Sequence, residues 1–144
     1  MSHLFETHRH IDAPPAPVWA VLQDVAGWPG WTPTVTAVTI LDGDEMQVGL
    51  RAAVRQPRLP RAEWTVTEVV PGRSFTWEAT GPGLRTVARH VVEPDGDGSR
   101  VTLSIEQTGP MGAVAARVWR GLTQRYIETE AASLDRTVTG APAA

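Results

Sequence analysis

Residues 109–138, GPMGAVAARVWRGLTQRYIETEAASLDRTV, predict one long amphipathic helix. Apolar side chains recur at i, i+3 and i+4, and polar side chains occupy the opposite face. Pro110 stands in the first turn, where a helix tolerates proline, and Gly140 lies just beyond the expected end. At roughly 1.5 Å per residue, the helix reaches about 40 Å, the width of a small domain. The apolar face is expected to comprise Met111, Val114, Ala115, Val118, Trp119, Leu122 and Tyr126.

Two polar residues, Thr129 and Ser133, continue the apolar face of this helix. One interpretation is that the far end of the helix is half exposed to solvent. The other is that the helix covers a cavity whose wall contains a few polar groups. Leu122 lies at the centre of the apolar face, and we expect it to be buried.

Most of the remaining chain alternates between apolar and polar side chains, as strands do. Turn sequences such as Asp42-Gly43-Asp44 separate these segments, so an antiparallel meander is the simplest topology. Residues 18–25 predict a short helix, and residues 27–33 predict a rigid loop or a single helical turn. Strands are expected at residues 3–11, 35–41, 46–55, 61–70, 74–79, 84–93 and 100–107.

These elements indicate an α+β fold. A curved antiparallel sheet of about seven strands wraps around the long C-terminal helix, with two short helices after the first strand. Alternation places Phe75 and Trp77 on one face of their strand and turns Val101 and Leu103 inward. Because a helix rarely fills the concave face of such a sheet, we expect a pocket between them.

Composition limits the classes of function. The 144 residues fit one domain, residues 1–144, and the absence of cysteine excludes disulfides and thiolate metal sites. No signal peptide and no apolar run long enough to span a membrane is present, so we expect a cytoplasmic protein. The net charge is −3 and the basic residues are spread along the chain, so nucleic-acid binding is not expected. We expect no cofactor, and either a monomer or a homodimer.

Several short motifs occur in order along the chain. They are Ala13-Pro14, Val18-Trp19, Asp24, Trp31-x-Pro33, Glu68 with Pro71, Trp77, His90 and the turn at residues 95–98. Together they resemble the START-like or SRPBCC superfamily, in particular its polyketide cyclase/dehydrase branch. The resemblance covers nearly the whole chain and implies a helix-grip fold with a deep apolar cavity under the final helix. It also implies binding of a lipid, a polyketide or another hydrophobic small molecule, although the superfamily includes carriers, hormone receptors, allergens, cyclases and chaperone activators.

His90 is the only histidine in the middle of the chain, and histidine is suited to proton transfer near neutral pH. Alternation alone leaves its direction open, and the resemblance favours an inward side chain. The alternative is a hydrogen-bonded wall residue without chemistry. No metal site is expected, because His8 and His10 share a strand face but lack a third ligand nearby.

Other candidate residues surround the expected pocket. Arg51 and Arg55 share one strand face, and they either anchor an anionic group of a ligand or serve as surface charges. Tyr126 either presents its hydroxyl to a ligand or belongs to the core. His90 and Tyr126 are the catalytic candidates. The ligand-binding candidates are Trp31, Trp64, Trp77, His90, Trp119, Leu122, Tyr126, Arg51 and Arg55.

Three hypotheses for function follow. The first is a carrier for a hydrophobic, ring-containing ligand. The second is a polyketide cyclase/dehydratase in which His90 acts as acid and base. The third is a protein-interaction module like the chaperone activators. For the first two, we predict that His90 and at least two of Trp31, Trp64, Trp77 and Trp119 border one cavity under the C-terminal helix.

Overall fold

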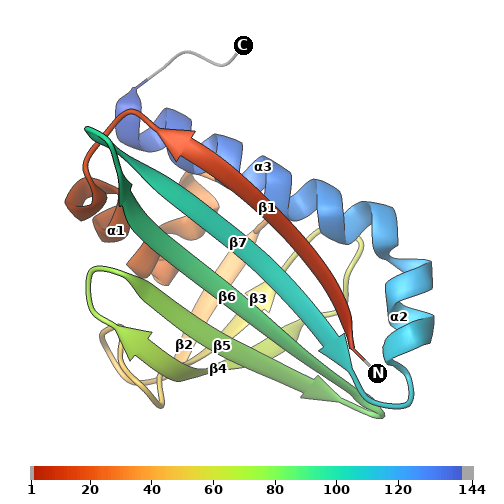
Figure 1. Ribbon diagram of the computed structural model, residues 1–144. Helices are drawn as coiled ribbons and strands as arrows, with labels where there is room; N and C mark the ends of the chain where they lie inside the picture. Colours follow the sequence, from red (N-terminus) through yellow and green to blue (C-terminus); the bar gives the residue numbers. More distant parts are fainter. Residues whose placement is uncertain (1, 141–144) are drawn as a thin grey trace.

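A computed structural model describes residues 2–140, which form a curved antiparallel sheet and a set of helices (Figure 1). The seven strands follow the order β1-β7-β6-β5-β4-β3-β2, so the meander β2 to β7 is completed by β1 pairing with β7. This is the helix-grip α+β fold expected from the sequence. The elements are β1 His3–Ile11, α1 Pro15–Gln23, the 3₁₀ helix η1 Val25–Gly30, β2 Ala37–Asp42, β3 Arg51–Arg55, β4 Ala62–Val70, β5 Ser74–Gly81, β6 Leu84–Asp95, β7 Gly98–Thr108, α2 Gly112–Val118 and α3 Arg120–Thr139.

The strands end close to the turn residues that separate them in the sequence. Gly96, with a φ of 61°, forms the tight turn that pairs Asp95 of β6 with Gly98 of β7. The strand boundaries differ from the predictions by at most two residues except in β3, where the segment from Met46 becomes a strand only at Arg51. Gly49 has a φ of 97° just before that point, a conformation incompatible with an extended strand.

The long C-terminal helix is divided, contrary to the prediction of one continuous helix. Trp119 adopts φ −108° and ψ 15°, outside helical values, and separates α2 from α3. Figure 1 shows that the two helices point in different directions. The C-terminal end agrees with the prediction, because Gly140 has a φ of 69° and donates its backbone N–H to the carbonyl oxygen of Arg136.

This division also changes which face of the helix is buried. Val114 and Val118 are 50% and 65% exposed, and Leu122 is only half-buried, so the predicted apolar face is wrong. A helical wheel assumes one uninterrupted helix. Because the helix is broken at Trp119, the wheel does not give the correct face for the residues on both sides of the break. The residues that α3 buries are Ile127, Glu130, Ala131, Ser133 and Leu134.

The C-terminal half of α3 closes the core, whereas its N-terminal half does not. Leu134 is fully buried, and Asp135 accepts a 2.8 Å hydrogen bond from Nε of Arg9 on β1. The inner face of the sheet contributes buried Phe75, Trp77 and Leu103, as alternation predicted. The side chains of α3 near Trp119 remain partly accessible, so a space is left between this part of the helix and the sheet.

Candidate functional site

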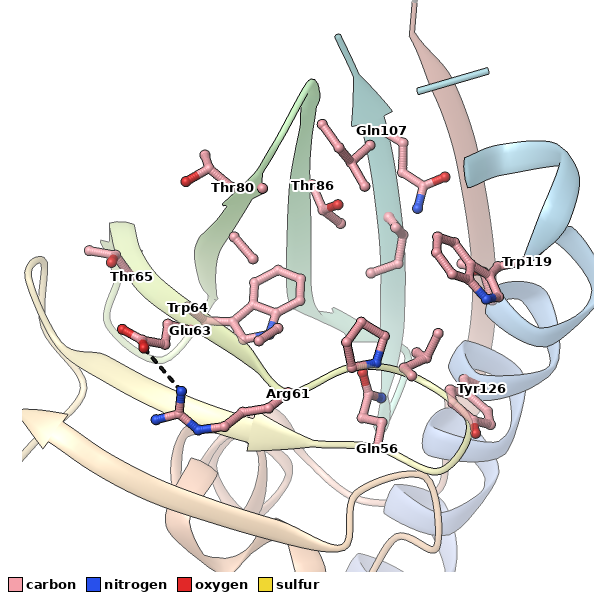
Figure 2. A pocket seen from close by; sticks show the side chains of 18 of the residues that line it. Gln56, Arg61, Glu63, Trp64, Thr65, Thr80, Thr86, Gln107, Trp119 and Tyr126 are labelled. Atoms are coloured by element: carbon pink, nitrogen blue, oxygen red, sulfur yellow. Dashed lines mark hydrogen bonds and ion pairs between the residues drawn. The ribbon is translucent and has the colours of Figure 1, made fainter. Parts of the chain in front are cut away.

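A cavity of about 680 Å³ lies between the N-terminal half of α3 and the concave face of the sheet (Figure 2). Strands β4 to β7 supply its floor, and the loop at residues 56–61 supplies one side. The hydroxyl of Tyr126 on α3 donates a hydrogen bond to the carbonyl oxygen of Pro57, which ties the helix to that loop. The apolar part of the wall includes Trp64, Ala79, Leu84, Ile105, Trp119 and Ile127.

Two tryptophans give the cavity large flat surfaces. Trp64 of β4 is 8% exposed, and its ring lies 5.4 Å from that of Trp77 with an angle of 30° between the planes. Trp119, at the break between α2 and α3, faces the cavity from the opposite side (Figure 2). The irregular backbone at Trp119 therefore lies where an aromatic ring lines the cavity.

Glu130 is the buried carboxyl group in the cavity wall, with about nine-tenths of its surface covered. Its Oε1 accepts a 3.0 Å hydrogen bond from Oγ1 of Thr34, whose oxygen lies 2.8 Å from Oγ1 of Thr32. Among the described residues, Oε2 has no hydrogen-bond partner. Burial raises the pKa of Glu130 to about 7, while the bond from Thr34 acts in the opposite direction. The carboxyl therefore exchanges protons near neutral pH.

Gln107 adds a second polar group whose bonding is incomplete. It lies on β7 opposite Thr86 of β6, and its side chain is 6% exposed. Its Oε1 is buried without a hydrogen-bond partner within residues 2–140. Figure 2 shows the amide next to Trp119 at the upper part of the cavity. The buried Oε1 has almost no accessible surface, so a ligand in the cavity meets it only if the amide rotates.

Three charged side chains lie at the rim of the cavity. Arg51 of β3 and Arg61 of the loop each place a guanidinium nitrogen 3.0 Å from an oxygen of Glu63. All three are exposed, so their ion pairs are screened by water. Arg55 is also exposed but lies outside the cavity wall.

His90 faces the concave side of the sheet, but it does not reach the cavity. Its ring stacks on Phe75 with centroids 4.1 Å apart, and Trp28 of η1 lies 5.5 Å away on another side. Burial lowers its pKa to about 4, so it is neutral at neutral pH. The prediction that His90 borders the cavity is wrong, because Trp28 fills the space in front of it.

The structure separates the remaining candidates into two groups. Trp64, Trp119, Tyr126 and Arg51 line the cavity, and their part in ligand binding stays a prediction. The other candidates, which lie outside the cavity wall, are Trp31, Trp77, Leu122, Arg55 and His90.

Sequence reasoning missed the polar residues that distinguish this cavity. The apolar positions Ile127, Ala131 and Leu134 of α3 follow i, i+4 and i+3 spacing, and they enclose Glu130 on the same face. Gln107 follows Ile105 at the alternation that turns side chains inward. The spacing around Glu130 and the alternation at Gln107 are both visible in the sequence. Because glutamate is rarely buried, however, a glutamate on a helix is ordinarily assigned to the solvent face.

The family described as "Polyketide cyclase / dehydrase and lipid transport" matches residues 2–139. The chain belongs to this family. None of the curated proteins matches it in sequence. Within residues 2–140, no helix is long and apolar enough to cross a membrane, and no group of three or more side chains is arranged to hold a metal ion.

Solved structures share the fold at low sequence identity. TTHA0849 from Thermus thermophilus is 20% identical, with a TM-score of 0.76 over 98% of this chain and 100% of that one. Ara h 8.0201 is 14% identical, with a TM-score of 0.75 over 98% and 100% of the two chains. The hypothetical protein jhp0584 from Helicobacter pylori is 15% identical, with a TM-score of 0.80 over 94% and 88%. At these identities, the likeness establishes the helix-grip fold alone.

Proposed function

We propose that this family member binds a hydrophobic, ring-containing small molecule in the cavity beneath α3. The observation that carries the proposal is a space of about 680 Å³ with Trp64 and Trp119 in its wall. Ligand pockets of proteins have volumes of about 300–1,000 Å³ and are lined mainly by apolar and aromatic side chains. An aromatic wall offers a flat ligand a large contact area at a small cost in side-chain entropy.

The polar groups of the wall support a ligand-binding role rather than a structural one. A core that serves only stability leaves few buried polar atoms without partners. Here Oε1 of Gln107 is buried without a partner among the described residues, and Oε2 of Glu130 also has no hydrogen-bond partner there; both side chains line one cavity. The buried Nε1 of Trp31, outside the cavity, lacks a partner as well. A ligand with polar substituents would satisfy the groups in the cavity wall. An open cavity also argues against the hypothesis of a protein-interaction module with a filled interior.

Isothermal titration calorimetry with 2-naphthalenemethanol tests this proposal. The wild-type protein should bind one molecule, and Thr123→Phe should abolish binding because Thr123 of α3 lines the cavity and the larger ring fills it. Arg125→Phe is the matched control, since Arg125 is exposed on the same helix and outside the wall. Equal binding by both variants would show that the cavity is not the site.

A second candidate function is that of a cyclase/dehydratase, and Glu130 is the observation that favours it. A general acid or base works best when its pKa lies near the working pH. With a pKa of about 7 and a place in the cavity wall, Glu130 meets this requirement, whereas His90 does not. Turnover of a poly-β-ketone thioester should then fall by about 10²–10⁴-fold in Glu130→Gln, with binding retained. The carrier hypothesis predicts no turnover by the wild-type protein.

A further inference from the structure

The inner wall of the cavity contains one acidic side chain and no basic one. Its titratable side chains are the carboxyl of Glu130 and the phenol of Tyr126, whose hydroxyl is bonded to Pro57. The only cations in the wall, Arg51 and Arg61, lie at the rim and pair with Glu63. The sequence contains no lysine at all. A ligand that reaches the inner wall therefore meets a carboxyl group without a counter-ion.

The carboxyl is arranged to accept a further hydrogen bond. Thr34 occupies Oε1 of Glu130, and the Thr32 hydroxyl in turn lies within hydrogen-bond distance of Thr34. These two threonines hold the carboxyl in place from the segment that follows η1 and leave Oε2 without a partner among the described residues. A fixed acceptor in an apolar site selects a ligand that donates a hydrogen bond.

We propose that the natural ligand carries a basic nitrogen, held by the carboxyl of Glu130, with its apolar part against Trp64 and Trp119. This inference rests on the proposed function. An ammonium group supplies both the donor that Oε2 lacks and the positive charge that a buried carboxylate requires.

Of the groups around Glu130, none other is expected to change its protonation state when a ligand binds. Helix α1 contains no charged residue, and the threonine segment before β2 contains none. On the sheet, His90 has a pKa of about 4 and stays neutral above about pH 5, while Arg9 of β1 is paired with Asp135 of α3. Glu128 of α3 is exposed and bonded by Gln124. An ammonium ligand should therefore favour the ionised form of Glu130 and release a proton.

Calorimetry with three matched probes tests the inference: 2-naphthylmethylamine, 2-naphthalenemethanol and 2-naphthoate. The amine should bind the wild-type protein most tightly, and its affinity should rise from about pH 5 to about pH 8 as Glu130 ionises. Near pH 6, titrations in buffers of different ionisation enthalpy should show protons released with the amine and none with the alcohol. Glu130→Gln should weaken amine binding by about tenfold to a hundredfold, the range for hydrogen bonds to charged groups, and should weaken alcohol binding less, because the alcohol donates only a neutral hydrogen bond.

A second variant keeps the carboxyl and changes its environment. Thr34→Val removes the bond that lowers the pKa of Glu130, so the pH at which amine binding strengthens should move upward. If the alcohol binds but the amine gains nothing from Glu130 or from pH, the inference is wrong and the proposed function stands. Tightest binding by 2-naphthoate would overturn it in favour of an anion held by the rim arginines. If none of the three probes binds, the proposed function itself fails.

Discussion

Glu130→Gln should make the free protein more stable at neutral and alkaline pH. In the wild type, the folded state holds the Glu130 pKa at about 7, above the value of 4.5 for an unperturbed glutamate. A folded state that binds protons more tightly than the unfolded state loses stability as the pH rises between the two pKa values. The glutamine cannot ionise, yet its amide oxygen can still accept the hydrogen bond from Thr34.

The size of the effect follows from the pKa difference. One pKa unit corresponds to about 1.36 kcal/mol, so a shift from 4.5 to about 7 amounts to roughly 3 kcal/mol. The wild type carries this penalty in full above about pH 7 and not at all below about pH 4.5. The gain in unfolding free energy of Glu130→Gln over the wild type should therefore be about 3 kcal/mol near pH 8 and close to zero near pH 4.

Urea unfolding followed by tryptophan fluorescence measures this difference. Curves collected at several pH values between about 4 and 8 should show the gain of Glu130→Gln growing through the range in which Glu130 ionises. Glu128→Gln is the matched control, because Glu128 is exposed on the same helix, and its effect should stay within about 0.5 kcal/mol at every pH. A gain that does not depend on pH, or a loss of stability near pH 8, would refute the buried carboxyl described here.

Four further substitutions test the core and the cavity wall. In the wild type, the His90 pKa is lowered from 6.5 to about 4, so the folded state loses stability as the pH falls through that range. His90→Gln should reduce this loss of unfolding free energy at acid pH by up to about 3 kcal/mol. The same loss in the variant as in the wild type would contradict the prediction. Leu134→Ala should lower the free energy of unfolding in urea by about 2–5 kcal/mol, because Leu134 is fully buried. Leu122→Ala should lower it by about 1 kcal/mol, because Leu122 is only half-buried. The reverse order would support the apolar face predicted from the sequence. Tyr126→Phe should lose about 1 kcal/mol and speed amide hydrogen exchange at residues 56–61, since it removes the bond to Pro57; unaltered exchange would mean that this bond does not hold the loop.

The sheet was predictable because its signals are local. Alternation turned Phe75, Trp77 and Leu103 to the inner face, and glycine turns such as Gly96 marked the ends of the strands. Each of these features depends on a few neighbouring residues. The strand that begins five residues later than predicted, at Arg51, follows a glycine whose positive φ the alternation pattern does not record.

The site was less predictable because it depends on contacts between distant segments. No proline or glycine stands at Trp119 to mark the break that moves the buried face of the helix. Trp28 covers His90 only once η1 has folded over the sheet. The burial of Glu130 depends on Thr34, which lies 96 residues away along the chain. Patterns within one element do not contain such information.

The position of a bound ring tests the central claim most directly. Crystals of the protein grown with 2-bromonaphthalene would locate the bromine through its anomalous scattering. The cavity beneath α3 should contain the bromine, with the naphthalene ring in contact with Trp64 and Trp119. A bromine found instead on the exposed face of α2 beside Val114 and Val118, or no ordered bromine at saturating concentration, would contradict a hydrophobic binding site in this cavity.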